Sequence, residues 1–119
     1  MEGAFSICNE QIEANNITIA SGVLTPICNK WLEKGVYFIG TNLRLTLPAA
    51  CQIEQFISVD GIQDAAGSSA NNLEAGFQSN NIGFIIEVKQ TSANVVFQAR
   101  QYSGSPLEIT GWMFVTKLK

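Results

Sequence analysis

The sequence predicts an all-β fold, a single antiparallel β-sandwich or jelly roll, on three observations. Apolar residues recur at every second position through most of the chain, and no stretch of helical length repeats them with a period of about 3.6. The alternating runs are short, lie about ten residues apart, and are separated by Gly, Asn and Pro. A chain of 119 residues is long enough for one hydrophobic core and too short for two. We therefore expect one domain over residues 1–119 with about seven to eight main strands.

The first elements lie in the N-terminal quarter of the chain. Residues 1–15 are expected to form an N-terminal arm or a first strand, with residues 5–8 as the candidate for an eighth strand. Apolar and polar residues alternate over residues 16–20 and again over residues 23–29. Because Pro26 cannot donate a ladder hydrogen bond, the second of these strands is expected at a sheet edge or with a bulge.

The clearest strand is predicted over residues 35–47. Successive side chains of a strand point to opposite faces, so one set of alternate residues should enter the core. This inward set is Tyr37, Ile39, Thr41, Leu43, Leu45 and Leu47. Asn42, Arg44 and Thr46, on the other face, are expected to meet water.

The remaining strands are predicted over residues 51–60, 82–90, 95–102 and 107–118. Between the second and third of these, residues 91–94 read as a chain reversal. In the last strand the apolar pattern changes face from Ile109 to Trp112, which predicts a bulge near Gly111.

Residues 60–81 form the one long segment without clear alternation. They are rich in Gly, Ala, Ser and Asn, so we expect a long loop that contains one short strand around residues 73–78. If that strand is absent, the segment is expected to be a functional loop.

The composition excludes several classes of function. Charged residues make up 14% of the chain and the net charge is −3, so a surface that binds nucleic acid is not expected. The sequence contains no His, which excludes Ser-His-Asp and Cys-His catalysis and His-based zinc sites. No pair of carboxylates is spaced to flank a glycosidic bond. We expect no enzyme activity, no catalytic residues and no cofactor.

Metal binding and secretion are not expected either. Asp60 and Asp64 supply too few oxygens for a calcium site. Cys8, Cys28 and Cys51 lack a C-x-x-C spacing and are expected to be buried thiols, with one disulfide as the alternative. The N-terminus has neither a basic start nor a long apolar run, so we expect no signal peptide and no membrane partner.

Binding of a sugar remains an open alternative. Exposed aromatic rings can stack on sugar rings while amides bond to hydroxyl groups. Trp31, Asn71 and Asn72 are the candidate ligand contacts, and Tyr102 is a further aromatic candidate. The competing interpretation is that these residues belong to solvated turns.

Three stretches of the sequence resemble the jelly rolls of the C1q and tumour-necrosis-factor-like family. Residues 32–40, with the sequence LEKGVYFIG, resemble a strand near the start of that fold. Residues 95–109 resemble its penultimate hairpin and residues 111–118 its closing strand. The order and spacing of these stretches are most similar to those of bacteriophage head-fibre, capsid decoration and tail-fibre knob domains.

The resemblance implies a homotrimer whose subunits pack through an apolar face of one sheet. Several aromatic residues fall on strand faces that the alternation does not assign to the core, which also favours a partner surface. Tyr102, Trp112 and Phe114 are the candidate interface residues, unless the register is wrong by one residue and they belong to the core.

The function that follows is that of a non-enzymatic virion protein. We expect a trimeric capsid decoration or head-fibre subunit of a bacteriophage, assembled in the host cytoplasm with other virion proteins. The alternatives are a tail-fibre knob that binds a host-surface glycan or receptor, and a secreted bacterial C1q-like adhesion domain.

Overall fold

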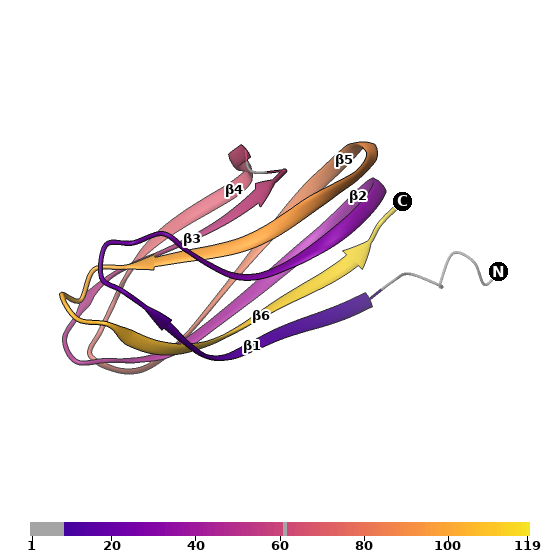
Figure 1. Ribbon diagram of the computed structural model, residues 1–119. Coiled ribbons are helices and arrows are strands. Elements are labelled where there is room, and N and C mark those ends of the chain that lie inside the picture. Colours follow the sequence, from indigo (N-terminus) through magenta and orange to yellow (C-terminus); the bar gives the residue numbers. More distant parts are fainter. Residues whose placement is uncertain (1–8, 61) are drawn as a thin grey trace.

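The computed structural model describes residues 9–60 and 62–119, which form one antiparallel sheet of six strands (Figure 1). The strands are β1 (Asn9–Ile19), β2 (Thr25–Leu47), β3 (Cys51–Val59), β4 (Ile62–Leu73), β5 (Gly76–Gln101) and β6 (Leu107–Lys117). Their order across the sheet is β1-β6-β2-β5-β3-β4. In these two described ranges no helix has the length and apolar character needed to cross a membrane. The predicted all-β class is confirmed.

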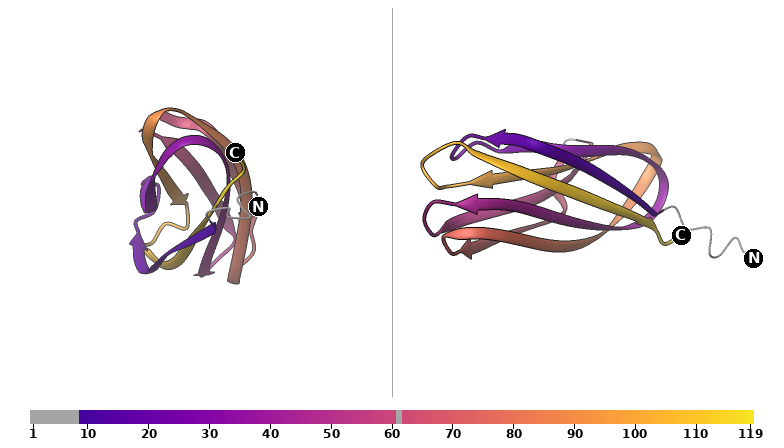
Figure 2. Two further views of the ribbon diagram at one scale, coloured as in Figure 1. Left: turned by 90° about the vertical axis from the view of Figure 1, so that its right-hand side faces the viewer. Right: turned by 90° about the horizontal axis from the view of Figure 1, so that it is seen from below.

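The sheet folds over on itself because β2 and β5 bend together. Residues 25–33 of β2 pair with residues 92–99 of β5, and residues 35–47 pair with residues 76–88. The ladder is irregular between Glu33 and Gly35, where both strands turn the corner (Figure 1). Seen from its end, the sheet curls so that its two halves face each other (Figure 2).

The result is a sandwich of two layers that share β2 and β5. The β6 layer consists of β1, β6, the second half of β2 and the first half of β5. The β3 layer consists of the first half of β2, the second half of β5, β3 and β4. This arrangement is the predicted antiparallel jelly roll, with four strand segments in each layer.

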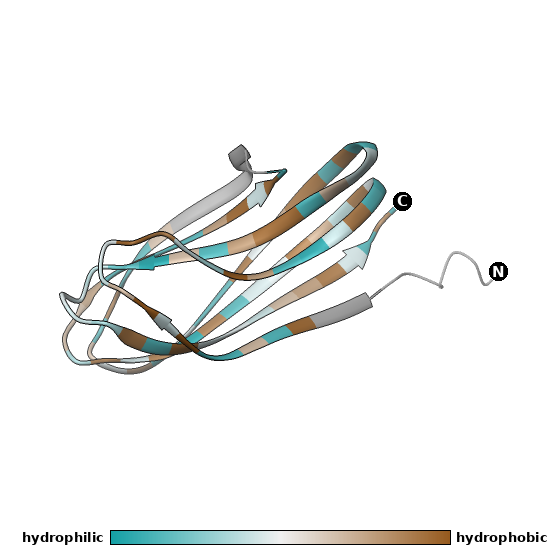
Figure 3. Ribbon diagram, in the orientation of Figure 1, coloured by the Kyte–Doolittle hydropathy of each residue, from teal (hydrophilic) through white to brown (hydrophobic). Residues whose placement is uncertain are grey.

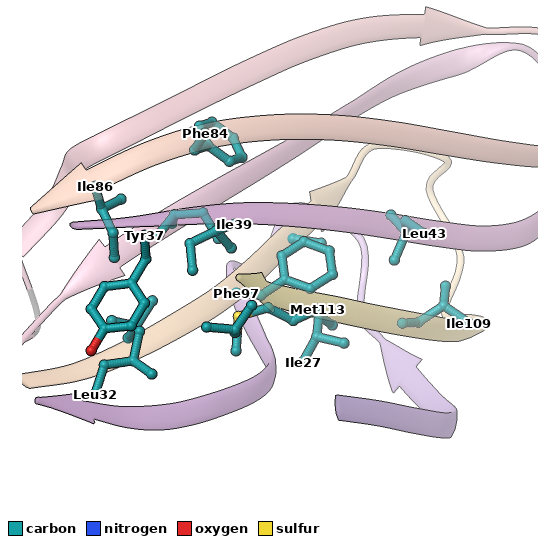
Figure 4. Packing of buried hydrophobic residues seen from close by; sticks show 14 of the residues in the cluster. Ile27, Leu32, Tyr37, Ile39, Leu43, Phe84, Ile86, Phe97, Ile109 and Met113 are labelled. Carbon is teal, nitrogen blue, oxygen red and sulfur yellow. The ribbon is translucent and has the colours of Figure 1, made fainter. Parts of the chain in front are cut away.

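The core lies between the layers and follows the alternation of the sequence (Figure 3). All six residues predicted to point inward from residues 37–47 are buried. Ile39 from the β6 layer and Phe97 from the β3 layer are both fully buried (Figure 4). The predicted register is therefore confirmed for this strand, and the aromatic residues on its other face are not core residues.

Polar and steric contacts also tie the layers together. The Thr41 hydroxyl in the β6 layer donates a hydrogen bond to Oε1 of Gln55 in the β3 layer, at 2.7 Å. Gly111 of β6 lies so close to the opposite layer that a Cβ atom there would be 2.6 Å from Cγ2 of Ile27. At the corner, the Tyr37 hydroxyl donates to the carbonyl of Glu33, at 2.7 Å.

The prediction of a long loop over residues 60–81 is wrong. Residues 62–73 form β4, and β5 begins at Gly76. β4 pairs with β3 from Cys51↔Leu73 onward, at the edge of the β3 layer. An edge strand needs only one neighbour, and here the apolar neighbour β3 supplies the pairing that the small polar residues of β4 do not predict by themselves. The expected short strand at residues 73–78 is interrupted by the turn between β4 and β5.

Two expected chain breaks are also absent. Residues 91–94 do not reverse the chain, because β5 continues through them to Gln101. The predicted strands at residues 23–29 and 35–47 are not separate, because β2 runs from Thr25 to Leu47 and leaves only residues 23 and 24 outside it. The residues that suggested these breaks lie at the corner. There β2 and β5 bend together, and their hydrogen-bonded pairing resumes after the bend. The irregularity predicted around Pro26 is confirmed, between Pro26 and Cys28.

The bulge expected near Gly111 lies instead in the neighbouring strand. β6 pairs with β2 in unbroken register, whereas the β1 ladder shifts between Ala14 and Ile17. Asn16 within this bulge has a φ of 54°. Gly111 points inward with Ile109, so the apparent change of face in the sequence reflects a glycine at a crowded core position.

Two residues expected on open surface are buried. Asn42 points outward, but its amide donates to Oγ of Ser79 at 2.9 Å and to Oδ1 of Asn81, and these neighbours on β5 cover it. Phe56 is 7% exposed because the guanidinium of Arg100 lies over its ring, 5.6 Å from the centroid. Residues 5–8, the candidate for an eighth strand, lie outside the described residues.

Candidate functional site

The outer face of the β6 layer carries the most distinctive surface of the described chain. Because Gly111, Met113 and Val115 of β6 point into the core, Trp112 and Phe114 must point away from it. Phe114 lies opposite Gly40 of β2, and Trp112 lies opposite Asn42. This face has an apolar end and a polar end.

The apolar patch is formed by Phe38, Ile85 and Phe114. Phe38 and Ile85 are directly paired across β2 and β5, and all three side chains are exposed. The ring of Phe38 lies over Gly83, where a Cβ atom would be 2.9 Å from the ring. Gly40 is similarly close, with a Cβ position 3.3 Å from the same ring. These glycines let the ring lie flat along the sheet beside a shallow hollow of about 370 Å³.

The Trp112 groove lies at the polar end of the same face and has a volume of about 560 Å³. Side chains from β1, β2, β5 and β6 line it, among them Glu13, Asn15, Asn16, Arg44, Phe77, Glu108 and Trp112. The Arg44 guanidinium lies 4.5 Å from the centroid of the Trp112 ring, in a cation–π contact. The groove and the apolar patch are neighbours on this face, since Trp112 of the groove and Phe114 of the patch are two residues apart on β6, about 7 Å along the strand.

A charged and aromatic cluster occupies the outer face of the β3 layer. Arg100 Nε donates to Oε1 of Glu54 at 2.6 Å, and the Tyr102 hydroxyl donates to the same oxygen at 2.8 Å. Gln52 donates to Oε2 of Glu54 at 3.3 Å. The Arg100 guanidinium also lies 5.6 Å from the centroids of both the Phe56 and the Tyr102 rings. Arg100 Nε, the Tyr102 hydroxyl and the Gln52 amide all bond to the Glu54 carboxylate, so the cluster holds β3 against the end of β5.

The protonation states of this cluster follow from the same contacts. Burial raises the pKa of Glu54, but hydrogen bonds from Arg100, Tyr102 and Gln52 and the positive charge of Arg100 outweigh burial and lower it below the ordinary 4.5. The hydrogen bond to Glu54 raises the pKa of Arg100 and also that of Tyr102. The cluster therefore holds one carboxylate and one guanidinium near neutral pH.

The three predicted interface residues do not share one face. Trp112 and Phe114 lie on the outer face of the β6 layer, whereas Tyr102 lies against Glu54 on the outside of the β3 layer. All three are at least partly exposed. Whether they contact another subunit stays a prediction.

The predicted ligand contacts are also divided between two places. Asn72 is paired with Gln52, so it lies beside the Tyr102 cluster, whereas Asn71 is paired with the buried Ile53 on the other face of the layer. Trp31 is 63% exposed but is paired with Asn94, near the opposite end of the β3 layer. The structure thus brings Asn72 towards Tyr102 and leaves Asn71 and Trp31 apart from them.

Phe77 and Ile85 are surface residues that the sequence analysis missed. Phe77 falls in the segment that the sequence predicts to be a loop. Its place in a strand follows from its pairing with Thr46 of β2. Ile85 follows the buried Phe84 and precedes the buried Ile86. The sequence indicates Ile85 only by its place between two inward residues, because the outward positions of an alternating strand are usually polar.

The described residues offer little for metal or thiol chemistry. Among the side chains that the structure describes, those of residues 12–60 and 70–119, no three or more Cys, Asp or Glu gather as a metal site would require. Asp60 accepts a hydrogen bond from the backbone N–H of Asn94, at 2.8 Å, and another from Gln90. Cys28 and Cys51 are free thiols, and burial raises the pKa of Cys28 to about 12, which keeps it protonated.

Comparisons with known proteins identify the fold. The sequence matches no protein-family model and no curated protein sequence. The structure is similar to that of the infectious bursal disease virus VP2 subviral particle, with a TM-score of 0.70 and 12% identity over 96% of this chain and 34% of that one. It is also similar to the globular domain of zebrafish complement 1qA, with a TM-score of 0.60 and 8% identity over 93% of this chain and 97% of that one.

A third similar structure is the C-terminal domain of EclA, described as a sugar-binding protein. Its TM-score is 0.54, with 10% identity over 87% of this chain and 74% of that one. The chain spans about a third of the length of the virus-particle chains that it matches. At these identities the comparisons establish the fold, a jelly roll of the C1q-like kind that structural and binding proteins use.

Proposed function

We propose that the chain is a non-enzymatic structural subunit of a bacteriophage particle, working as a homotrimeric capsid decoration or head-fibre protein. It would assemble in the host cytoplasm with other virion proteins, and its partners would be neither nucleic acid nor membrane. The apolar patch carries this proposal, because three large apolar side chains lie together on one open sheet face. The likeness to a virus-particle protein supports the particle setting.

Sedimentation of purified protein tests the trimer. The expected result is a trimer for the natural chain and a monomer for a Phe114→Ser, Ile85→Ser double variant, because both substitutions place a hydroxyl in the proposed contact. A Trp31→Ser variant is the matched control, since it removes an even more exposed aromatic ring from the other layer. A monomeric natural chain, or a double variant that remains a trimer, contradicts the proposal.

Binding to phage capsids tests the particle role. Purified protein is expected to co-sediment with empty capsids, at saturating stoichiometry, when it is mixed with a phage whose own decoration protein has been removed. Protein that remains in the supernatant with every capsid type tried contradicts decoration and favours a fibre or receptor role.

The second candidate function is a glycan- or receptor-binding knob of a tail fibre, or a secreted C1q-like adhesion domain. The position of Asn72 beside the Tyr102 cluster favours it, as does the likeness to a sugar-binding protein. A glycan array is the test. Binding that is lost in Tyr102→Ala or in Trp31→Ala supports this function at the predicted contacts.

A further inference from the structure

A local irregularity of β1 shapes the Trp112 groove. Its volume of about 560 Å³ lies within the range of roughly 300–1,000 Å³ that is typical of small-molecule sites. The β1 ladder shifts between Ala14 and Ile17, so Asn15 and Asn16 leave the regular pairing and line the groove. Bulges commonly redirect side chains in this way next to binding sites.

Arg44 supplies free hydrogen-bond donors to the groove. Its guanidinium is held over the Trp112 ring, 4.5 Å from the centroid. Within the described part of the chain, no carboxylate forms an ion pair with it. By contrast, Arg100 on the other layer is bound to Glu54 at 2.6 Å. Stacking therefore orients the Arg44 guanidinium while its N–H groups stay available to a ligand.

The groove also contains acceptors and an open aromatic ring. Glu13 and Glu108 bring carboxylates from β1 and β6, and Asn16 adds an amide that can donate and accept. Phe77 on β5 is 67% exposed, so its ring face is accessible, whereas Arg44 covers a face of Trp112. The groove thus combines donors, acceptors and one apolar ring.

This combination selects one class of ligand. Two carboxylates against one guanidinium give the lining a net negative charge, which disfavours phosphates and acidic sugars. Neutral hydroxyl groups both donate and accept, so they can bond to carboxylates, amides and a guanidinium together. We propose that the Trp112 groove is a binding site for a neutral saccharide, with Phe77 as the stacking platform and Arg44 and Glu108 as hydrogen-bonding partners. Phe114 of the apolar patch is about 7 Å from Trp112 along β6, so the test of this site also follows the oligomeric state.

The chain allows a direct optical test of this site. It has two tryptophans, so a Trp31→Phe variant leaves Trp112 as the sole tryptophan reporter. This variant is titrated with lactose, cellobiose, maltotriose, mannobiose and diacetylchitobiose while the Trp112 emission is followed. We expect a saturable change with at least one of these sugars at concentrations up to about 20 mM.

Variants in the same background locate the site. Phe77→Ala is expected to weaken the binding about tenfold, and Glu108→Gln about threefold to tenfold. Val23→Ala is the matched control, because Val23 is 52% exposed and lies outside both the groove and the apolar patch. It should leave the affinity unchanged. Sedimentation of each variant shows independently whether the oligomeric state has changed.

Three outcomes overturn the proposal. The first is no saturable change with any sugar of the panel. The second is binding that Phe77→Ala leaves unaffected, which places the saccharide elsewhere. The third is binding of sialyllactose without binding of lactose, because that result assigns the site to acidic sugars. The trimer proposal survives all three, since none of them concerns the apolar patch.

Discussion

Gln101 anchors the loop between β5 and β6. It is 1% exposed, and its Nε2 donates to the carbonyls of Ile19 and Ser105 at 2.9 and 2.7 Å. Its Oε1 accepts a hydrogen bond from the backbone N–H of Ser103 at 2.7 Å. One amide therefore bonds to three backbone groups, of which the Ser105 carbonyl has a second donor, the Ser103 hydroxyl at 2.9 Å.

Substitution Gln101→Leu is expected to lower the free energy of unfolding by about 3 kcal/mol, because it removes three hydrogen bonds and leaves the Ile19 carbonyl and the Ser103 N–H without the side-chain partner. Urea denaturation at neutral pH measures the change. Gln98→Leu, at an outward and half-buried position on the same strand, is the control and should change stability little. A loss below about 0.5 kcal/mol for Gln101→Leu would show that water replaces the amide.

Glu54 makes stability depend on pH. Its pKa is lowered in the folded protein, so the carboxylate form contributes stability above the ordinary pKa of 4.5. This contribution is lost as the pH falls through the lower folded pKa. The Glu54 side chain is 16% exposed and that of Arg100 is 29% exposed, so solvent screens the pair only in part.

Arg100→Gln is therefore expected to flatten the acid limb of the stability profile. Urea unfolding between about pH 3 and pH 7 should show that the difference between the natural chain and the variant shrinks towards acid. Tyr102→Phe should have the same effect to a smaller degree, since it removes one neutral donor. Parallel profiles would mean that Glu54 does not have a lowered pKa.

At the scale of elements, the contact between β6 and β2 depends on the absence of a side chain. Gly111 faces Ile27 across the sandwich, with a prospective Cβ position 2.6 Å from Cγ2 of Ile27 and 3.4 Å from the Phe97 ring. The two layers can approach here because β6 has no side chain at this point. The two layers cannot separate here without opening the core around Phe97.

Gly111→Ala is expected to destabilise the protein by about 1–3 kcal/mol through overpacking. In an Ile27→Ala background the same substitution should cost clearly less, since the clashing methyl group is gone. A double-mutant cycle measured by chemical denaturation gives the coupling energy. Additive effects of the two substitutions would show that the layers can separate locally.

The elements show where sequence reasoning succeeds. The alternation from Tyr37 to Leu47 predicts the inward face of β2 correctly, because successive side chains of a strand point to opposite faces. The corner at Glu33 and residues 91–94 was not predicted. Residues typical of turns occur there, and the sequence does not show whether they end a strand or bend two paired strands together. β4 escaped because its pairing is determined by β3.

The candidate site was predictable only in part, for the same reason. Trp112 and Phe114 are visible in the sequence as aromatics outside the core pattern. The groove around Trp112 depends on Phe77 and on the bulge at Asn16, and these meet through pairings between strands that are distant in sequence. The pairing of these distant strands cannot be read from a single sequence.

At the scale of the whole molecule, the proposed trimer has a thermodynamic consequence. If folding and assembly are coupled, the thermal midpoint should rise with protein concentration, because association stabilises only the folded chain. Differential scanning calorimetry over a hundredfold range of concentration measures this effect. The Phe114→Ser, Ile85→Ser variant should unfold at a midpoint independent of concentration. A natural chain that behaves in the same way contradicts the coupling.

The shared corner of β2 and β5 means that this protein cannot be divided into two independent halves. Each layer takes two of its four strand segments from β2 and β5, so a cut in the peptide chain near residue 34 leaves two fragments that are each missing partners. Such fragments should remain unstructured alone and regain the native fold when mixed. This behaviour would make the corner a suitable position for a split reporter, whose signal appears only on recombination.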